Sequence, residues 1–401
     1  MTTLKEFISA FKGPNGLANL FVCMVWGSYM SIFVKGVVLR IPGLNIFADY
    51  CIPIIYVVML LFAAKQLIAK SSVKDFLFWL ICTTVFLCHY GFGPSANTSA
   101  MDEYFPSFIL SVSSCVFIGK SMGDKKLLDG LYWVSIFTIV TFFFYNFMVN
   151  TSAAFMEGGS SESQGLSYSL LPHLLFVLWR TFEKFDILSL LMTVFAMFMM
   201  LAMGSRGPVL SVLAFVVLYL LICKKFYKYW YLIVLLAVGG YYIYNNITII
   251  AMGLQTLLDG MGFSTRILDI MIEGESASDI ERQWIVEKCL EAIKDKPFGI
   301  GLCGSFPIVG GYPHNLFLEF AVSFGWAIGI VLSILLIIYI IKGLICCQDD
   351  EQRGLLVLLI SASVVNLLVS GTFLNSMHFY MLIGFCALMI QNKKNSKQFD
   401  K

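Results

Sequence analysis

Apolar runs of about 20 residues recur along the chain and are separated by shorter polar segments. A helix needs a run of about that length to cross the hydrocarbon core of a bilayer. The pattern predicts an all-α integral membrane protein, a polytopic bundle of about 12 transmembrane helices. The whole chain, 1–401, is read as one membrane domain. The expected spans are 17–37, 45–64, 75–92, 104–119, 128–149, 165–179, 187–204, 208–223, 229–251, 314–341, 354–373 and 377–392.

The positions of the basic residues predict the orientation of these spans. With a cytoplasmic N-terminus, the inner segments carry 19 of the 27 lysines and arginines, and the outer segments carry 8. Cytoplasmic loops hold an excess of positive charge, so both termini are expected in the cytoplasm. The polar start before the first span predicts a permanent first helix and no cleaved signal peptide.

Composition supports a membrane protein and excludes other classes. Hydrophobic residues make up 59% of the chain and charged residues 13%, against about 25% charged in soluble domains. The lipid bilayer is therefore an expected partner. A net charge of +2 argues against a nucleic-acid partner.

The largest polar segment, 253–313, is predicted to be an outer loop between the ninth and tenth spans. Long loops in compact proteins are usually functional or disordered. Within it, 280–294 has the spacing of an amphipathic helix, with Trp284 as an anchor at the outer membrane interface. Spacing leaves open a disulfide between Cys289 and Cys303, because it says nothing of their geometry.

Three arginines on the predicted outer side are candidates for binding an anion. Arg206 lies in Gly-Ser-Arg-Gly-Pro, 204–208, which predicts a tight outer hairpin. Arg266 and Arg282 lie in the large loop. A guanidinium binds phosphate bidentately. The alternative for Arg206 is a snorkelling arginine at a helix end, and for Arg266 and Arg282 it is an exposed ion pair within the loop.

The segment Pro-His-Asn-Leu-Phe-Leu-Glu, 313–319, carries the other candidates. Pro313 is expected in the first turn of the tenth span, whose free N–H groups would face outward and favour an anion. His314 at this position titrates near neutral pH, as a general acid or base must. Glu319 is expected inside the span, where an ionisable group usually has a function or a hydrogen-bonding role.

These motifs together resemble those of the O-antigen polymerase and O-antigen ligase superfamily. The resemblance rests on 204–208, on 313–319, and on Lys-Pro-Phe-Gly-Ile-Gly at 296–301, in a chain of many spans with a large late outer loop. After His-Asn the family has nine residues and then glycine, as Gly325 is here. Gly329 follows one position later than the commonest spacing. The resemblance covers roughly residues 190–345 and leaves the first half similar only in topology.

The resemblance implies a membrane glycosyltransferase of the GT-C type in the bacterial inner membrane. Its donor and acceptor are undecaprenyl-pyrophosphate-linked oligosaccharides, and it uses no metal or other cofactor. Arg206, together with Arg266 or Arg282, is expected to neutralise the pyrophosphate. A chain-length regulator stays open as a further partner.

On the acceptor side, His314 is expected to activate or orient the sugar hydroxyl. Tyr312, Asn315 and Glu319 are expected to position that sugar.

Polymerase and ligase share this chemistry and differ in the acceptor, which is another lipid-linked oligosaccharide or the lipid A core. The residues of the motifs around Arg206 and His314 resemble those of polymerases more than those of ligases. A flippase for the same lipid-linked sugars is a third possibility, but its charged residues should line a pathway at the bilayer midplane. Here the candidate residues gather on the predicted outer side, which favours an enzyme.

Overall fold

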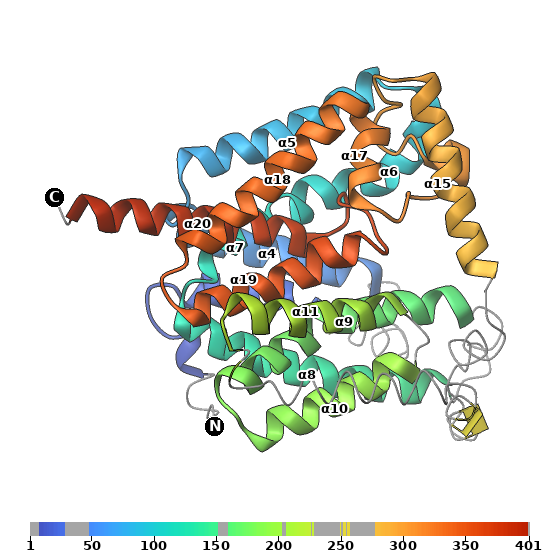
Figure 1. Cartoon of the computed structure of the whole chain (residues 1–401). Helices are drawn as coiled ribbons and strands as arrows, with labels where there is room; N and C mark the ends of the chain where they lie inside the picture. Colours follow the sequence, from blue (N-terminus) through green and yellow to red (C-terminus); the bar gives the residue numbers. More distant parts are fainter. Residues whose placement is uncertain are drawn as a thin grey trace. The chain divides into compact units, whose positions relative to one another are not determined.

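The computed structural model describes residues 8–28, 48–150, 159–202, 206–225, 227, 249, 252–253, 255–256 and 277–399 (Figure 1). Within these ranges every regular element is a helix and none is a strand. The all-α prediction is therefore confirmed for the described part of the chain. The chain divides into two compact units, each built from separated segments: Met1–Lys70 with Ser121–Gly274, and Ser71–Lys120 with Glu275–Lys401.

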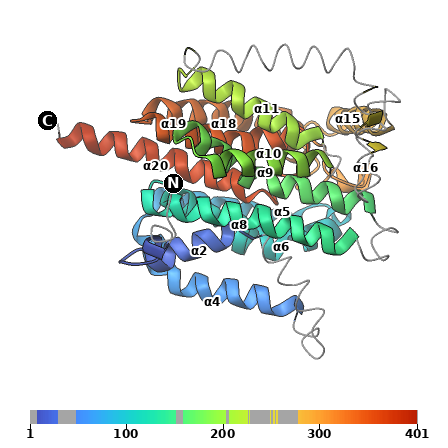
Figure 2. The ribbon, with the colours of Figure 1, turned by 90° about the horizontal axis from the view of Figure 1, so that it is seen from below.

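The first unit is a helical bundle centred on α9. Its helices are α2 (Gly16–Trp26), α4 (Ala48–Ala69), α8 (Lys125–Asn150), α9 (Gly159–Glu183), α10 (Ile187–Ala202) and α11 (Arg206–Ile222). Helix α9 packs against α8, α10 and α11, and α2 packs against α4 and α8 (Figure 2). From Leu170 to Trp179 nearly every side chain of α9 is buried. An apolar helix surrounded by others in this way forms a core.

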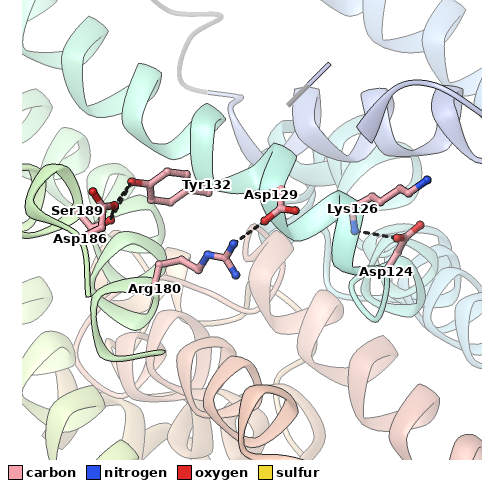
Figure 3. A network of polar contacts seen from close by, with 7 residues as sticks. All are labelled: Asp124, Lys126, Asp129, Tyr132, Arg180, Asp186 and Ser189. Atoms are coloured by element: carbon pink, nitrogen blue, oxygen red, sulfur yellow. Dashed lines mark hydrogen bonds and ion pairs between the residues drawn. The ribbon is translucent and has the colours of Figure 1, made fainter. Parts of the chain in front are cut away.

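A polar network joins α8, α9 and the start of α10 (Figure 3). The Arg180 guanidinium is buried and forms an ion pair with Asp129. Next to it, the Tyr132 hydroxyl donates to the Asp186 carboxylate at 2.9 Å, and Ser189 donates to the same carboxylate. Charged groups at this depth need such partners, because an unpaired buried charge is costly.

The second unit contains α5 (Val73–Phe92), α6 (Thr98–Ser107), α7 (Cys115–Ser121), α15 (Ala277–Asp295), α16 (Phe306–Val309), α17 (Leu316–Phe324), α18 (Trp326–Cys346), α19 (Asp350–Ile360) and α20 (Met377–Phe399). Short 3-10 and π-helical segments lie at Ser95–Asn97, Phe108–Val112 and Ser361–Val365. Helix α20 packs against α18 and α19. A Cβ built on Gly384 of α20 would meet the backbone of Val116 and Gly119 on α7. Small residues allow this close approach of membrane helices.

Three helices among the described residues have the length and apolar composition to cross a membrane: Val73–Phe92, Lys125–Phe144 and Trp326–Cys346. Five shorter apolar helices accompany them. Most side chains of α18 are exposed on the protein, including Ile330, Ile334 and Ile338. Such a surface suits lipid and would be unstable in water. The chain is a membrane protein, and the count of 12 spans stays a prediction.

Several predicted spans differ from the observed helices. The span at 104–119 is a helix interrupted by the π-helical segment Phe108–Val112, and the span at 354–373 contains the π-helical segment Ser361–Val365 and leaves the helix after Leu367. The first span reaches Trp26 as α2, and its remainder, like most of 229–251, lies outside the described residues.

The predicted span 314–341 is wrong as a single helix. It consists of α17 and α18, which are joined at Gly325 (Figure 1). Gly325 has φ +85°, a left-handed conformation that ends a right-handed helix. The two helices then pack tightly, because a Cβ on Gly329 would lie 2.6 Å from the Ala321 Cα. This hairpin places Glu319 on the short helix α17, directly after His314 and Asn315, and the apolar span on α18.

Candidate functional site

The predicted loop helix is observed as α15, three residues longer at its start than the predicted 280–294. Ile285, Cys289 and Ile293, spaced four residues apart, are buried against α17. That spacing puts them on one face of the helix. Trp284 lies outside this stripe and is 45% exposed. Its role as a membrane anchor stays a prediction.

The segment 296–301 holds the C-terminal end of α17. The backbone N–H of Ile300 donates to the Val322 carbonyl at 2.8 Å, and that of Gly301 donates to the Ser323 carbonyl at 3.2 Å. These are end carbonyls of a helix, which lack partners within it. Gly299 has φ +89°, and a Cβ there would lie 2.5 Å from the Gly325 nitrogen. The glycines of this motif therefore serve a backbone-to-backbone contact.

At the other end of α17, Asn315 is the N-cap. Its Oδ1 accepts from the N–H groups of Phe317 at 3.0 Å and Leu318 at 3.1 Å. The helix begins at Leu316, so the placement of Pro313 in its first turn is wrong. The expectation of free N–H groups for an anion is also wrong at these two residues, because the asparagine side chain occupies them. The Nδ2 of Asn315 is the part that can donate to a substrate.

His314 lies just before this cap in a conformation that few residues adopt. Its φ is +55°, a left-handed value that costs free energy in any residue other than glycine. Its Nδ1 is buried and has no hydrogen-bond partner among the described residues. The Tyr312 ring lies with its centroid 4.6 Å from that of the imidazole. Strain and an unsatisfied buried nitrogen together are typical of a functional group held ready for a ligand.

Two charged residues of α15 act on the imidazole of His314. Burial lowers the pKa of His314 below its ordinary value, and the positive charge of Arg282 lowers it further, while the negative charge of Glu281 opposes this. These effects favour the neutral imidazole, which is the form that can accept a proton. Arg282 is itself exposed, so its guanidinium can meet a ligand from solvent.

Glu319 is buried one helical turn further into the unit. Its carboxylate accepts from the Thr372 hydroxyl and, at 3.3 Å, from the Phe373 N–H. These bonds connect α17 to the segment before α20. The alternative of a hydrogen-bonding role for Glu319 is thus observed.

The structure places the remaining predicted site residues only in part. Arg266 lies outside the described residues. Arg206 begins α11 in the first unit, and its side chain lies outside the described atoms. Among the described residues, the positive charge of Arg282 acts on His314.

The cysteines of the loop form no disulfide. Cys289 and Cys303 are both free and buried. Burial raises the pKa of the Cys289 thiol to about 11 and that of Cys303 to about 12. Both are therefore protonated and unreactive at neutral pH. Among the described residues, no group of three or more histidine, cysteine and acidic side chains is placed to hold a metal.

Comparison with known families identifies this region. Residues 191–334 match the family described as O-antigen ligase. This part of the chain is therefore similar to an O-antigen ligase domain. The resemblance to the O-antigen polymerase and ligase superfamily is thereby confirmed, and it indicates an enzyme of the ligase and polymerase type. No curated protein and no solved structure matches the chain.

All of the predicted site residues lie within the matched region, and two residues that support α17 lie outside it. Thr372 contacts Glu319, as described above. Asn97, before α6, is buried and donates from Nδ2 to the carbonyls of Ile300 at 2.9 Å and Leu302 at 3.0 Å. Asn97 ends the segment Gly-Pro-Ser-Ala-Asn, 93–97, whose residue types are those of a turn. No sequence pattern connects residues so far apart.

Proposed function

We propose that this protein is a membrane glycosyltransferase that polymerises undecaprenyl-pyrophosphate-linked oligosaccharide repeat units into surface polysaccharide, such as O-antigen or capsule. It acts at the outer face of the bacterial inner membrane and is metal-independent. The observation that carries the proposal is the strained His314 beside Arg282 in the region that matches the O-antigen ligase family. One group can accept a proton there, and the other can bind an anion.

In the proposed reaction the acceptor sugar hydroxyl attacks the anomeric carbon of the donor. The new glycosidic C–O bond forms while the bond from that carbon to the pyrophosphate oxygen breaks. His314 accepts the hydroxyl proton, and undecaprenyl pyrophosphate leaves with the electrons of the broken bond. Arg282 stabilises the developing negative charge on the leaving group, as oriented cations do at transition states.

The other residues predicted from the sequence have proposed roles toward the same substrates. Arg206, and Arg266 as the alternative to Arg282, supply further positive charge to the pyrophosphate. Tyr312 packs on the imidazole and presents its ring to the acceptor sugar. Asn315 donates a hydrogen bond from Nδ2 to the acceptor sugar. Glu319 is buried and fixes α17, the helix that follows Tyr312, His314 and Asn315.

The ligase remains the second candidate, because the family match does not separate it from the polymerase. The two enzymes would use the same residues on the donor. They differ in whether the acceptor is a second lipid-linked chain or the lipid A core.

Gel profiling of surface polysaccharide tests the proposal. Cells lacking the gene are complemented with wild type, His314→Ala, Arg206→Ala, Arg282→Ala or the control Arg353→Ala. Arg353 pairs with Asp350 on α19, where both side chains are partly exposed, so its loss should matter little. A polymerase predicts a single repeat unit on surface lipid in the deletion, with a ladder restored by wild type and Arg353→Ala alone.

Other outcomes point elsewhere. If all surface repeats vanish and polymerised lipid-linked chains accumulate, the protein is the ligase. If His314→Ala, Arg206→Ala and Arg282→Ala all restore the ladder as wild type does, the proposed site is wrong and a flippase becomes the better explanation.

A further inference from the structure

Asn97 connects two segments of the second unit that are far apart in the sequence. Its side chain is 4% exposed, and its amide nitrogen donates to both the Ile300 and Leu302 carbonyls. A single amide thus satisfies two buried acceptors with both of its protons. Gly301 lies between these carbonyls, and a Cβ there would be 3.3 Å from Asn97 Nδ2. The segment is therefore shaped to receive this side chain.

The segment that Asn97 holds is the one that caps α17. Ile300 accepts from Asn97 through its carbonyl and donates through its own N–H to Val322. The chain of bonds runs from Asn97 through Ile300 to the end of α17. The ring of His89 also contacts the C-terminal end of α17. It packs edge-on against the ring of Phe324, with the two ring centroids 5.7 Å apart.

Helix α17 carries this restraint to His314. It has nine residues and is about 13 Å long. Its far end is closed by the Asn315 cap, directly after His314. Because a helix moves as a rigid rod, a shift at its C-terminal end displaces the imidazole relative to Arg282 on α15.

We propose that Asn97 is a positioning residue for the reaction at His314, acting through the 296–302 segment and α17. The inference rests on the proposed function, because it needs His314 to be the reacting base. It assigns a role in the chemistry to a residue outside the region that matches the O-antigen ligase family. That region then depends on the earlier part of the chain for the geometry of its own site.

A purely structural role makes a different prediction, and Asn19 supplies the matched control. Asn19 is a buried asparagine of α2 in the first unit, and its Nδ2 donates to the Ala10 carbonyl at 3.0 Å. Asn19→Leu removes one buried amide-to-carbonyl hydrogen bond and Asn97→Leu removes two, and neither substitution adds charge. A general loss of stability should affect both variants alike. A loss of positioning should appear in Asn97→Leu alone.

The test uses full-length protein in membranes of the deletion strain, with the lipid-linked single repeat unit extracted from that strain as substrate. Membrane abundance, kcat, KM and the pH profile of kcat are measured for wild type, His314→Ala, Asn19→Leu and Asn97→Leu. For Asn97→Leu we expect kcat to fall by about 10- to 100-fold, since a misplacement near 1 Å has that effect. KM should change little.

The pH profile gives the readout that stability alone would not move. Loosening α17 admits water to His314, which raises its pKa toward the ordinary value. The acid limb of kcat should therefore move to higher pH in Asn97→Leu and stay in place in Asn19→Leu. If Asn97→Leu is absent from the membrane, Asn97→Ser, which keeps one donor in a smaller volume, carries the comparison.

The outcomes are distinguishable. If wild type is inactive on the repeat unit, or if His314→Ala is as active as wild type, the proposed function fails. If both of those behave as expected but Asn97→Leu matches Asn19→Leu in kcat and pH profile, Asn97 has no positioning role. Loss of both Asn97 variants from the membrane, with Asn19→Leu present, would also overturn it and leave a role in folding only.

Discussion

Gly329→Ala is the sharpest test of the α17–α18 hairpin. A Cβ at this position would lie 2.6 Å from the Ala321 Cα, 2.7 Å from its nitrogen and 3.0 Å from the Phe320 carbonyl carbon. All three atoms belong to the backbone, so no side chain can rotate away. The added methyl must be accommodated by moving one helix away from the other.

The size of the movement follows from these distances. Ordinary contact begins at 3.4 Å, so a pair now at 2.6 Å must separate by about 0.8 Å. Overpacking of a tight core usually costs about 1–3 kcal/mol. Because His314 directly precedes the N-cap of α17, a displacement of that helix near 1 Å can also lower the rate by about 100-fold. We therefore expect a lower midpoint of thermal unfolding together with nearly complete loss of activity.

Gly91→Ala is the matched control. Gly91 lies in α5, and a Cβ there meets no atom within 4 Å. The same substitution should be neutral or stabilise the helix by about 0.5–1 kcal/mol. Thermal unfolding in detergent and the surface polysaccharide ladder are measured for both variants. If Gly329→Ala unfolds at the wild-type temperature and restores a full ladder, the tight packing of α17 on α18 is wrong.

Two further predictions concern the charges and the hydrogen bonds around the site. Glu281→Gln removes a negative charge and should lower the pKa of His314, so that the acid limb of the kcat profile moves to lower pH. Arg282→Gln removes a positive charge and should raise that pKa, so that the acid limb moves to higher pH. Arg282→Gln should also raise KM for the lipid-linked donor. Thr372→Val removes the hydroxyl that donates to Glu319 and should destabilise the protein by about 1–3 kcal/mol, because a buried acceptor loses its partner.

The controls for these predictions come from the same elements. Glu291→Gln changes a charge on α15 that pairs with Lys288 and should leave the pH profile unchanged. A shift in the same direction for both Glu281→Gln and Arg282→Gln would contradict the electrostatic account of His314. For Thr372, Thr372→Ser retains the hydroxyl, so an equal loss of stability in the Val and Ser variants would show that the hydrogen bond has no effect.

The sequence predicted the class of the protein and most of the described helices, because long apolar runs are stable only in lipid or in a protein core. The helix at 280–294 was found from the spacing of its buried side chains, and α15 confirms it. The same method failed at 314–341. The apolar run continues through Gly325, and hydropathy cannot show that its backbone reverses there. The left-handed φ of Gly325 is fixed by contacts with the 297–299 segment.

The candidate site divides in the same way. The sequence predicts its chemical groups, because His314, Arg282 and Glu319 lie in short motifs whose side-chain types suit proton transfer and anion binding. It does not predict their arrangement. The hydrogen bonds from Thr372 to Glu319 and from Asn97 to Ile300 and Leu302 join residues that lie far apart in the sequence. The sequence therefore determined which chemical groups are present and that lipid surrounds the apolar segments. The tertiary structure decided which polar groups are hydrogen-bonded within the protein and which are available to a ligand. The physical reason is that hydrogen bonds between residues far apart in the sequence form only when the chain is folded.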